Sequence, residues 1–352
     1  MRVGVIFGGR SAEHDVSIMS ARYVVRMVRG LGHVAVLMAV DRWGRWWFDE
    51  MAARMLEEGA AVIEPPQGAV SPAERMPPVD RLTDADILFP VLHGPFGEDG
   101  TLQGVFEVLG IPYVGSGVTA SAVAMDKAVA KDVFRAHGLA VLPYMVLSRR
   151  DVERWPQAVV ARVESVLSYP VFVKPANLGS SVGITRVDGS HALVEALHLA
   201  GRYDSKIIVE QGISAREIEV SVLGNDEPEA SVPGEVVPAG EWYDYRSKYE
   251  DEGTQLLIPA PVSDEVAAQA RTMAITAFRA IGGAGLARVD FLMDRETEVL
   301  YINEVNTMPG FTQVSMYPKL WEASGLSGED LVARLIQLGL ERHAERQRSH
   351  IA

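Results

Sequence analysis

The stretch ARVDFLMDRETEVLYINEVN, which ends at Asn306, constrains this chain more than any other. Two β-rich runs, ARVDFLM and EVLYINEVN, flank the short polar segment DRET, and this pattern predicts a β-hairpin. If the pairing centres on Thr297, Asp290 lies opposite Glu304 and Arg288 lies opposite Asn306. Residues that are opposite each other, or two apart on one strand, share a face of the sheet. One face of the hairpin would therefore carry four polar side chains.

These four side chains suit phosphate chemistry. Asp290, Glu304 and Asn306 are oxygen donors of the kind that Mg²⁺ takes, and substrate phosphates usually complete the shell of that ion. The guanidinium of Arg288 can stabilise charge on a transferring phosphoryl group. The alternative is an exposed hairpin with a polar outer face. A slip of one residue in the register would separate the four side chains, so the hypothesis depends on the register.

Composition excludes several classes of protein. A net charge of −14 argues against nucleic-acid binding, which needs a basic face. The absence of cysteine excludes disulfides and thiolate metal sites and fits a reducing compartment. The first residues have the pattern of a strand instead of a signal peptide, and no run approaches the ~18 apolar residues of a membrane helix. We expect a cytoplasmic globular protein of two or three domains that contacts no membrane.

The first part of the chain has a β-α-β pattern. The strand RVGVIF is followed by the turn GGRSAEHD, a helix that Asp15 or Ser17 could cap, and the strand HVAVLMAV. This order predicts a parallel sheet with ligands near the carboxyl ends of its strands. A further strand, DADILFPVLHG, brings His93 to such an end, where it either contacts substrate or braces the loop. We expect this domain to close near residue 118.

The next segment combines lysines with a glycine-rich loop. A helical run, MDKAVAKDVFRAHG, places Lys127 and Lys131 on one face, and a helix over 151–167 follows a strand. In YPVFVKPANLGSSVGITRV, two strands flank a loop whose glycines let backbone N–H groups approach an anion. Lys174 adds a cation, and two serines add hydroxyl groups. An ordinary Gly/Ser hairpin loop is the alternative reading.

Acids and aromatic residues occupy the region before the hairpin. Glu210 ends the strand KIIVEQG, and REIEVSVLG carries Glu217 and Glu219 on one face. A strand-end acid such as Glu210 can accept hydrogen bonds from an adenine amino group or ribose hydroxyls, or it can be a solvated surface group. The polar loop EWYDYRSKYEDEGTQLLIPAP contains three tyrosines and a tryptophan, and a loop of this length is typically a lid or packs on itself.

Together these features indicate a nucleotide site. Three of the six lysines, Lys127, Lys174 and Lys248, fall in or beside the stretches that suit phosphate. Motifs for a covalent nucleophile are missing: the chain has no cysteine, no G-x-S-x-G and no H-E-x-x-H. This combination favours phosphoryl transfer by positioning and electrostatics.

The motifs also carry a resemblance to a known family. KPANLGSSVGI, ARVDFL, INEVNTMPGFT and YDYRSKY resemble an ATP-grasp enzyme. FGGRSAEHDVS, LHGPFGEDGTLQG, GSGVTASAVAMDK and NTMPGFTQVSMYPKLWEASGL are similar to the D-alanine–D-alanine ligases, in the order that this family has. The similarity extends from Arg2 to about Leu326.

The resemblance implies a three-domain α/β ATP-grasp architecture. Residues 1–118 would form an N-terminal substrate-binding domain around a parallel sheet, and 119–212 a central ATP-grasp subdomain. Residues 213–352 would form a metal-binding α+β domain with a lid over 241–256. ATP would lie between the central and C-terminal domains with two Mg²⁺ ions, which Mn²⁺ can replace, and the protein would be a homodimer.

The resemblance also implies roles for individual residues. The phosphates of the nucleotide would be held by Lys127, Lys174, Ser180, Ser181 and Lys248. Its adenine amino group would be held by Glu210, and its ribose by Glu217. The metal ions would be held by Asp290, Glu304 and Asn306. The first D-alanine would be bound by Glu13, which Ser180 and Tyr249 would steady, and His93 would lie nearby. The developing oxyanion would be stabilised by Arg288 and the backbone of Gly310. The second D-alanine would be bound by Ser315.

The implied reaction joins two D-alanine molecules. The carboxylate of the first attacks the γ-phosphate of ATP and gives D-alanyl phosphate. The amine of the second then attacks the carbonyl carbon, which yields D-alanyl-D-alanine, ADP and phosphate for peptidoglycan precursor synthesis. Because an acyl phosphate hydrolyses readily, a lid that excludes water is a chemical requirement.

Three alternatives are distinguished by particular residues. A D-alanine–D-lactate ligase would lack the YDYxxKY pattern and use a histidine there, so Tyr249 favours an amine acceptor. A regulatory module that binds a nucleotide without turnover would have no physical need for the metal ligands of the hairpin. Another ATP-grasp carboxylate–amine ligase would not need Glu13 and Ser315 in their motifs.

Overall fold

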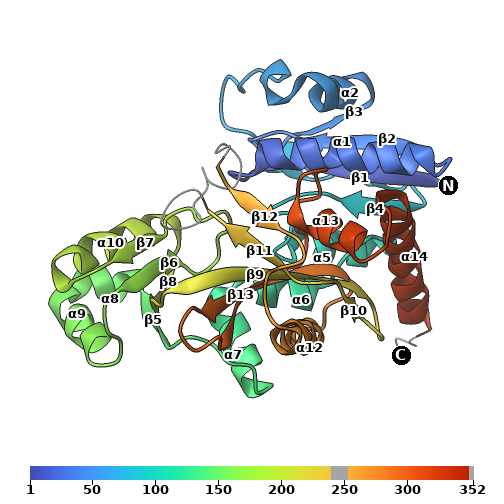
Figure 1. Cartoon of the computed structure of the whole chain (residues 1–352). Helices are drawn as coiled ribbons and strands as arrows, with labels where there is room; N and C mark the ends of the chain where they lie inside the picture. The colour runs from blue at the N-terminus through green and yellow to red at the C-terminus, as the bar shows by residue number, and fades with distance from the viewer. Residues whose placement is uncertain (239–252, 349–352) are drawn as a thin grey trace.

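The computed structural model describes residues 1–238 and 253–348. Within them the chain forms a four-stranded sheet at the N-terminal end, a second four-stranded sheet, and a six-stranded sheet, all covered by helices (Figure 1). The predicted α/β class is confirmed.

The N-terminal sheet has the strand order β3-β2-β1-β4. Strand β1 is parallel to β2 and β4, which confirms the parallel sheet, and β3 adds an antiparallel edge. The elements of this region are β1 (Arg2–Gly8), α1 (His14–Gly30), β2 (Val34–Val40), β3 (Trp46–Phe48), α2 (Asp49–Glu58), η1 (Ala60–Val62), α3 (Pro72–Arg75), α4 (Val79–Leu82), β4 (Ile87–Pro90), α5 (Thr101–Leu109) and α6 (Val118–Met125).

The expectation for the start of α1 is wrong. The helix begins at His14, Glu13 occupies the N-cap position, and no side chain caps it. Ser17 lies in the first turn and is fully buried. It does not cap the helix, because its hydroxyl has two other partners. It accepts from the backbone N–H of Gly8 at 2.8 Å and donates to the carbonyl of Val91. Ser17 thus ties the ends of β1 and β4 together.

The second sheet has the order β5-β8-β6-β7 with antiparallel pairs. The prediction of a single helix over 151–167 is wrong. One helix ends at Arg154, and after Trp155 a second helix begins with Pro156 at its first position. The elements here are α7 (Lys127–Ala136), β5 (Tyr144–Ser148), α8 (Arg149–Arg154), α9 (Pro156–Glu164), β6 (Val171–Pro175), β7 (Thr185–Val187), α10 (Ser190–Tyr203) and β8 (Lys206–Gln211).

The six-stranded sheet runs β12-β11-β9-β13-β14, with β10 paired to β9. The long strands β9 and β13 cross the middle of the molecule between the other two sheets (Figure 1). The remaining elements are β9 (Ala215–Gly224), β10 (Glu229–Ala230), β11 (Gly234–Val237), β12 (Gln255–Leu257), α12 (Asp264–Ala280), β13 (Gly285–Asp294), β14 (Leu300–Asn306), α13 (Met316–Ala323) and α14 (Gly328–Gln347).

The hairpin of β13 and β14 has the predicted register where it matters. Arg288 pairs with Asn306, and Asp290 pairs with Glu304. Beyond this point Phe291 pairs with Ile302, because a β-bulge leaves Asn303 as an extra residue on β14. The sequence did not predict the bulge.

The largest hydrophobic core joins the two ends of the chain. Leu331 and Leu335 of α14 pack in the same cluster as Val24 of α1 and Phe89 of β4. Helix α14 packs against α1 and β4 (Figure 1). No helix within residues 1–238 or 253–348 has the length and apolar character needed to cross a bilayer.

We predict that Ser17→Ala lowers the free energy of unfolding by about 1–3 kcal/mol, because it leaves a buried N–H and a buried carbonyl without their partner. Urea unfolding followed by circular dichroism measures the change. Ser165→Ala is the matched control, since that hydroxyl is exposed and contacts only the neighbouring Arg162 carbonyl. An equal loss in both variants would contradict the role given to Ser17.

Candidate active site

Two adjoining cavities form a cleft around the hairpin. The first, of about 610 Å³, lies between the β5–β8 sheet and the six-stranded sheet. The second, of about 580 Å³, reaches Glu13 and His93 at the carboxyl ends of the N-terminal strands. Lys127, Ser180 and Glu304 line both cavities. The polar motifs of all three regions therefore meet around one continuous space.

The glycine-rich loop after β6 approaches the N-terminal sheet closely. A Cβ atom at Gly179 would lie 3.2 Å from Oε2 of Glu13. Ser180 and Ser181 have φ values of 52° and 57°, in the left-handed region that non-glycine residues rarely adopt. The loop is anchored by Lys127, whose Nζ donates to the carbonyl of Leu178 at 2.8 Å. This conformation brings the loop beside an acidic group that is distant in sequence.

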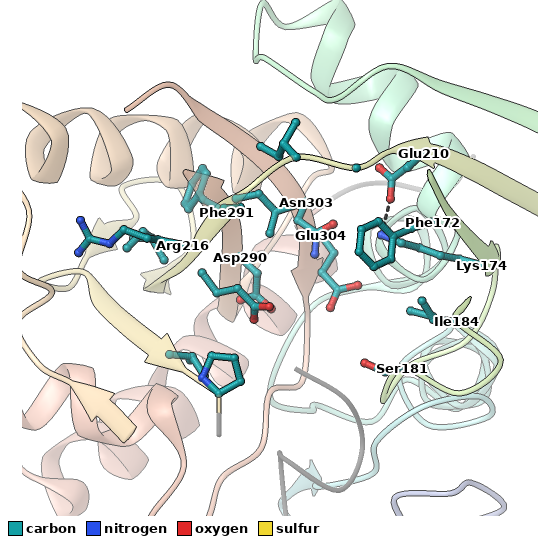
Figure 2. Close-up of a pocket in the computed structure, with 18 of the residues that line it drawn as sticks. Phe172, Lys174, Ser181, Ile184, Glu210, Arg216, Asp290, Phe291, Asn303 and Glu304 are labelled. Carbon is teal, nitrogen blue, oxygen red and sulfur yellow. Dashed lines mark hydrogen bonds and ion pairs between the residues drawn. The ribbon is translucent and has the colours of Figure 1, made fainter. Parts of the chain in front are cut away.

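Glu210 lies beneath the first cavity, only 2% exposed, which excludes a solvated surface acid. Lys174 forms an ion pair with its Oε2 atom (Figure 2), and Lys131 Nζ lies 2.5 Å from its Oε1 atom. Burial by itself would raise the pKa of Glu210, but the two ammonium groups lower this pKa to about 2. Glu210 is therefore a carboxylate at neutral pH.

The predicted polar face of the hairpin lines the cleft and is not an exposed outer face. Arg288 donates to both oxygens of Asp290 at 2.7 Å, and its Nε lies 3.0 Å from Oε2 of Glu219. The amide of Asn306 donates to Asp290 at 3.4 Å. Figure 2 shows the side chains of Asp290 and Glu304 directed into the cavity from neighbouring strands.

Glu304 faces a cation from another part of the chain. Lys127 Nζ lies 3.1 Å from Oε2 of Glu304. Burial alone would lower the pKa of Lys127, but the nearby carboxylate of Glu304 raises it above its ordinary value. Lys127 therefore joins the glycine-rich loop to the hairpin and keeps its charge.

The donor set fits a magnesium ion that also binds phosphate. Asp290, Glu304 and Asn306 present carboxylate and amide oxygens on one face, and Mg²⁺ prefers such hard ligands. Within the described ranges, no group of three or more His, Cys, Asp and Glu side chains is arranged to hold a metal. Two carboxylates and one amide leave room in the shell for substrate phosphates.

His93 braces two segments and also lines the second cavity. Its Nδ1 atom is 2.8 Å from the carbonyl of Met308, and its Nε2 atom is 3.2 Å from the hydroxyl of Ser20. The same hydroxyl accepts from the backbone N–H of Phe311 at 3.1 Å. Burial lowers the pKa of His93, so its imidazole is neutral at neutral pH. The contacts fix the chain after β14 against the N-terminal sheet.

Glu98 is a second buried acid in this region. Its Oε1 atom accepts from the N–H of Gly94 at 2.8 Å, which closes the loop after β4. Burial, and secondly the carboxylate of Glu13, raise the pKa of Glu98 to about 8. This acid keeps its proton at neutral pH, unlike Glu210.

The segment after the hairpin closes the second cavity. The N–H of Thr312 donates to the hydroxyl of Ser315 at 3.0 Å, and a Cβ atom at Gly310 would lie 3.1 Å from that hydroxyl. Gly310 and Ser315 both line this cavity. The structure therefore brings together, around the cleft, the described candidates Glu13, His93, Lys127, Lys174, Ser180, Ser181, Glu210, Glu217, Arg288, Asp290, Glu304, Asn306, Gly310 and Ser315.

Two candidates and most of the expected lid lie outside the described residues. These are Lys248, Tyr249 and residues 241–252 of the 241–256 segment.

Sequence reasoning assigned no site role to three residues that the structure places in or against the cleft: Lys131, Glu98 and Glu219. Lys131 could have been found from its position four residues after Lys127. Glu219 shares a strand face with Glu217 and lies opposite Asp290 in the register. Nothing in the local sequence distinguished Glu98 from an ordinary loop acid.

Comparison with known proteins decides the family. The sequence-family model for the D-ala D-ala ligase N-terminus matches residues 2–116. The family model for the D-ala D-ala ligase C-terminus matches residues 133–337. The chain belongs to the D-alanine–D-alanine ligase family. A D-alanine–D-alanine ligase from Heliobacterium modesticaldum is 49% identical, covering 99% of this chain and 96% of its own length. One from Natranaerobius thermophilus is 44% identical, with coverage of 99% and 97%.

Solved structures of the ligase family have the same fold. The D-alanine–D-alanine ligase from Coxiella burnetii aligns with a TM-score of 0.80 at 36% identity, covering 99% of this chain and 96% of that one. VanG, a D-Ala:D-Ser ligase from Enterococcus faecalis, aligns with a TM-score of 0.81 at 32% identity, covering 96% and 99%. The ATP-grasp assignment is thereby confirmed.

We predict that Glu98→Gln reduces the pH dependence of the stability of this ligase-family chain. Because the folded-state pKa of Glu98 is raised to about 8, its contribution to stability is complete below about pH 4.5 and is lost as the pH rises toward 8. In the wild type, the free energy of unfolding should fall by about 4 kcal/mol more than in the variant between pH 5 and 8.5. Urea unfolding at a series of pH values measures this. Identical profiles for the two proteins would refute the raised pKa.

Proposed function

We propose that the chain joins two D-alanine molecules into D-alanyl-D-alanine, with ATP converted to ADP and phosphate, for peptidoglycan precursor synthesis. The observation that carries this function is the single cleft in which the glycine-rich loop, the hairpin and Glu13 meet. Family membership over nearly the whole chain supports the same reaction.

We further propose how the chain divides around ATP. Residues 1–118 form the substrate-binding domain, 119–212 the central subdomain and 213–352 the C-terminal domain. ATP lies in the first cavity, with its phosphates toward Lys127, Lys174, Ser180 and Ser181, because cations and loop N–H groups gather there. Its adenine amino group faces Glu210, and its ribose faces Glu217. Lys248 approaches the γ-phosphate.

Asp290, Glu304 and Asn306 would hold two Mg²⁺ ions, or Mn²⁺ in their place, at the end of the triphosphate. When bound, these ions supply charge neutralisation for the β- and γ-phosphates. Lys127 lies beside Glu304 and adds a fixed positive charge from the side of the glycine-rich loop. The chain itself thus orients the phosphates from two directions.

The second cavity would hold the two amino acids. Glu13 binds the ammonium of the first D-alanine, and Ser180 and Tyr249 steady Glu13. His93 lies near this substrate. The carboxylate of this D-alanine attacks the γ-phosphate and forms D-alanyl phosphate. Ser315 binds the carboxylate of the second D-alanine, whose amine attacks the carbonyl carbon. Arg288 and the backbone N–H of Gly310 stabilise the resulting oxyanion.

The acceptor is the finer part of the proposal. VanG, which has a TM-score of 0.81, is named a D-Ala:D-Ser ligase, so the fold alone does not select the second substrate. D-Alanine is favoured by the relatives of 44–49% identity that are named D-alanine–D-alanine ligases. The alternatives are D-lactate as the acceptor, or the ligation of a different carboxylate–amine pair. We also propose a cytoplasmic homodimer without nucleic-acid or membrane partners.

Phosphate release with ATP and Mg²⁺ tests the reaction directly. Release with D-alanine alone, together with a dipeptide product, supports the proposal. Release only after D-lactate or D-serine is added would replace the acceptor but keep the phosphoryl transfer. L-Alanine is the stereochemical control, and the absence of release with every acceptor would overturn the proposed function.

We predict that Glu304→Gln lowers kcat at least about a hundredfold, equivalent to roughly 2.7 kcal/mol, because it removes a charged ligand from the phosphate end of the cleft. Steady-state phosphate release under saturating Mg²⁺ measures it. Glu296→Gln, in the exposed turn of the same hairpin, should keep wild-type activity. A normal kcat for Glu304→Gln would remove the metal role from the hairpin.

A further inference from the structure

We propose that Lys131 is a positioning residue that balances the charge of Glu210, so that the positive charge of Lys174 remains available to the phosphates of the nucleotide. This inference rests on the proposed nucleotide site. It gives a function to a lysine that lies behind the cavity and that local sequence reasoning left without a role.

Lys131 has a fixed place between the two sheets of the cleft. Its side chain is 1% exposed, and its ammonium lies 2.5 Å from Oε1 of Glu210 on β8. The same ammonium donates to the carbonyl of Asn303 on β14 at 3.1 Å. Asn303 is the extra residue of the β-bulge, so its carbonyl lies at an interruption of the ladder.

The neighbouring lysine has a different environment. Lys174 forms an ion pair with the other oxygen of Glu210, Oε2, and it lines the first cavity, whereas Lys131 is not among the residues that line it. Figure 2 shows Lys174 extending beside the open space and joined to Glu210. Of the two lysines, Lys174 is therefore the one that can contact a ligand.

The charges of the cluster explain why two lysines are needed. With Lys174 alone, a buried pair with Glu210 would be neutral, and an anionic ligand would have to compete with the carboxylate for its partner. With Lys131 on the opposite oxygen, the three groups keep one net positive charge. Since Lys131 is enclosed, that excess charge is presented to the cavity through Lys174. A cation in a partly desolvated cleft attracts phosphate strongly.

The packing keeps this arrangement in place. Lys131 occupies the face of α7 that also carries Lys127, and α7 packs against β14. Burial, and also the nearby ammonium of Lys174, lower the pKa of Lys131, and the Glu210 carboxylate opposes this effect without cancelling it. A buried ammonium without such a partner would be costly, so Lys131 and Glu210 stabilise each other's charged forms.

Lys131→Met tests the proposal because it leaves the neutral pair of Lys174 and Glu210 and no unpaired buried charge. The affinity for ADP, measured by calorimetry with Mg²⁺, should fall about tenfold, equivalent to 1.4 kcal/mol. Adenosine lacks phosphates, and its affinity in a competition assay should change less than about threefold. Lys131→Arg, which keeps the charge, should restore ADP binding toward the wild-type value.

Lys206→Met is the matched control, because Lys206 pairs with Asp126 at the start of the same helix but does not line the cavity. Unchanged ADP affinity in folded Lys131→Met would overturn the proposal. Equal losses for ADP and adenosine would also overturn it, since they would indicate a role in shape alone. If Lys131→Met does not fold, Lys131→Gln replaces it with the same expected outcomes. Failure of the proposed nucleotide site is distinguished from these outcomes, since the wild type would then bind no ADP.

Discussion

Two lysines one turn apart on α7 hold the sheets of the cleft at their positions. Lys127 joins the glycine-rich loop to Glu304, and Lys131 joins Glu210 to the bulged strand at Asn303. Buried ammonium groups require counter-charges and hydrogen-bond acceptors within a few ångströms. The carboxylates of two separate sheets are therefore constrained to face one helix, and the space between the sheets becomes the cleft.

The same cleft contains acids in opposite protonation states. Burial disfavours the charged form of both Glu98 and Glu210. Glu210 has two ammonium partners and a pKa of about 2, whereas Glu98 has the carboxylate of Glu13 nearby and a pKa of about 8. Glu210 lines the cavity where we place the nucleotide, and Glu98 lines the cavity where we place the amino acids.

Much of the fold follows from local patterns. The β-α-β opening and the buried strand before His93 predicted the parallel sheet, and the alternation around Thr297 predicted the pairing of Asp290 with Glu304. The start of α1 at His14 was not predicted, because Ser17 bonds to Gly8 and Val91 rather than to its own helix. The bulge at Asn303 also has no local signal, since it depends on how β14 packs.

The sequence by itself determined the types of residue in the site and their local spacing, because strand and helix periodicities place side chains on one face without reference to the rest of the chain. Only the tertiary structure decided which faces meet and how deeply they are buried. The contact between Lys131 and Glu210 joins α7 to β8, and the clustering of Glu13 with Gly179 joins α1 to a distant loop. Burial and distance set the charge of each group, and both depend on the packing of elements that are remote in sequence.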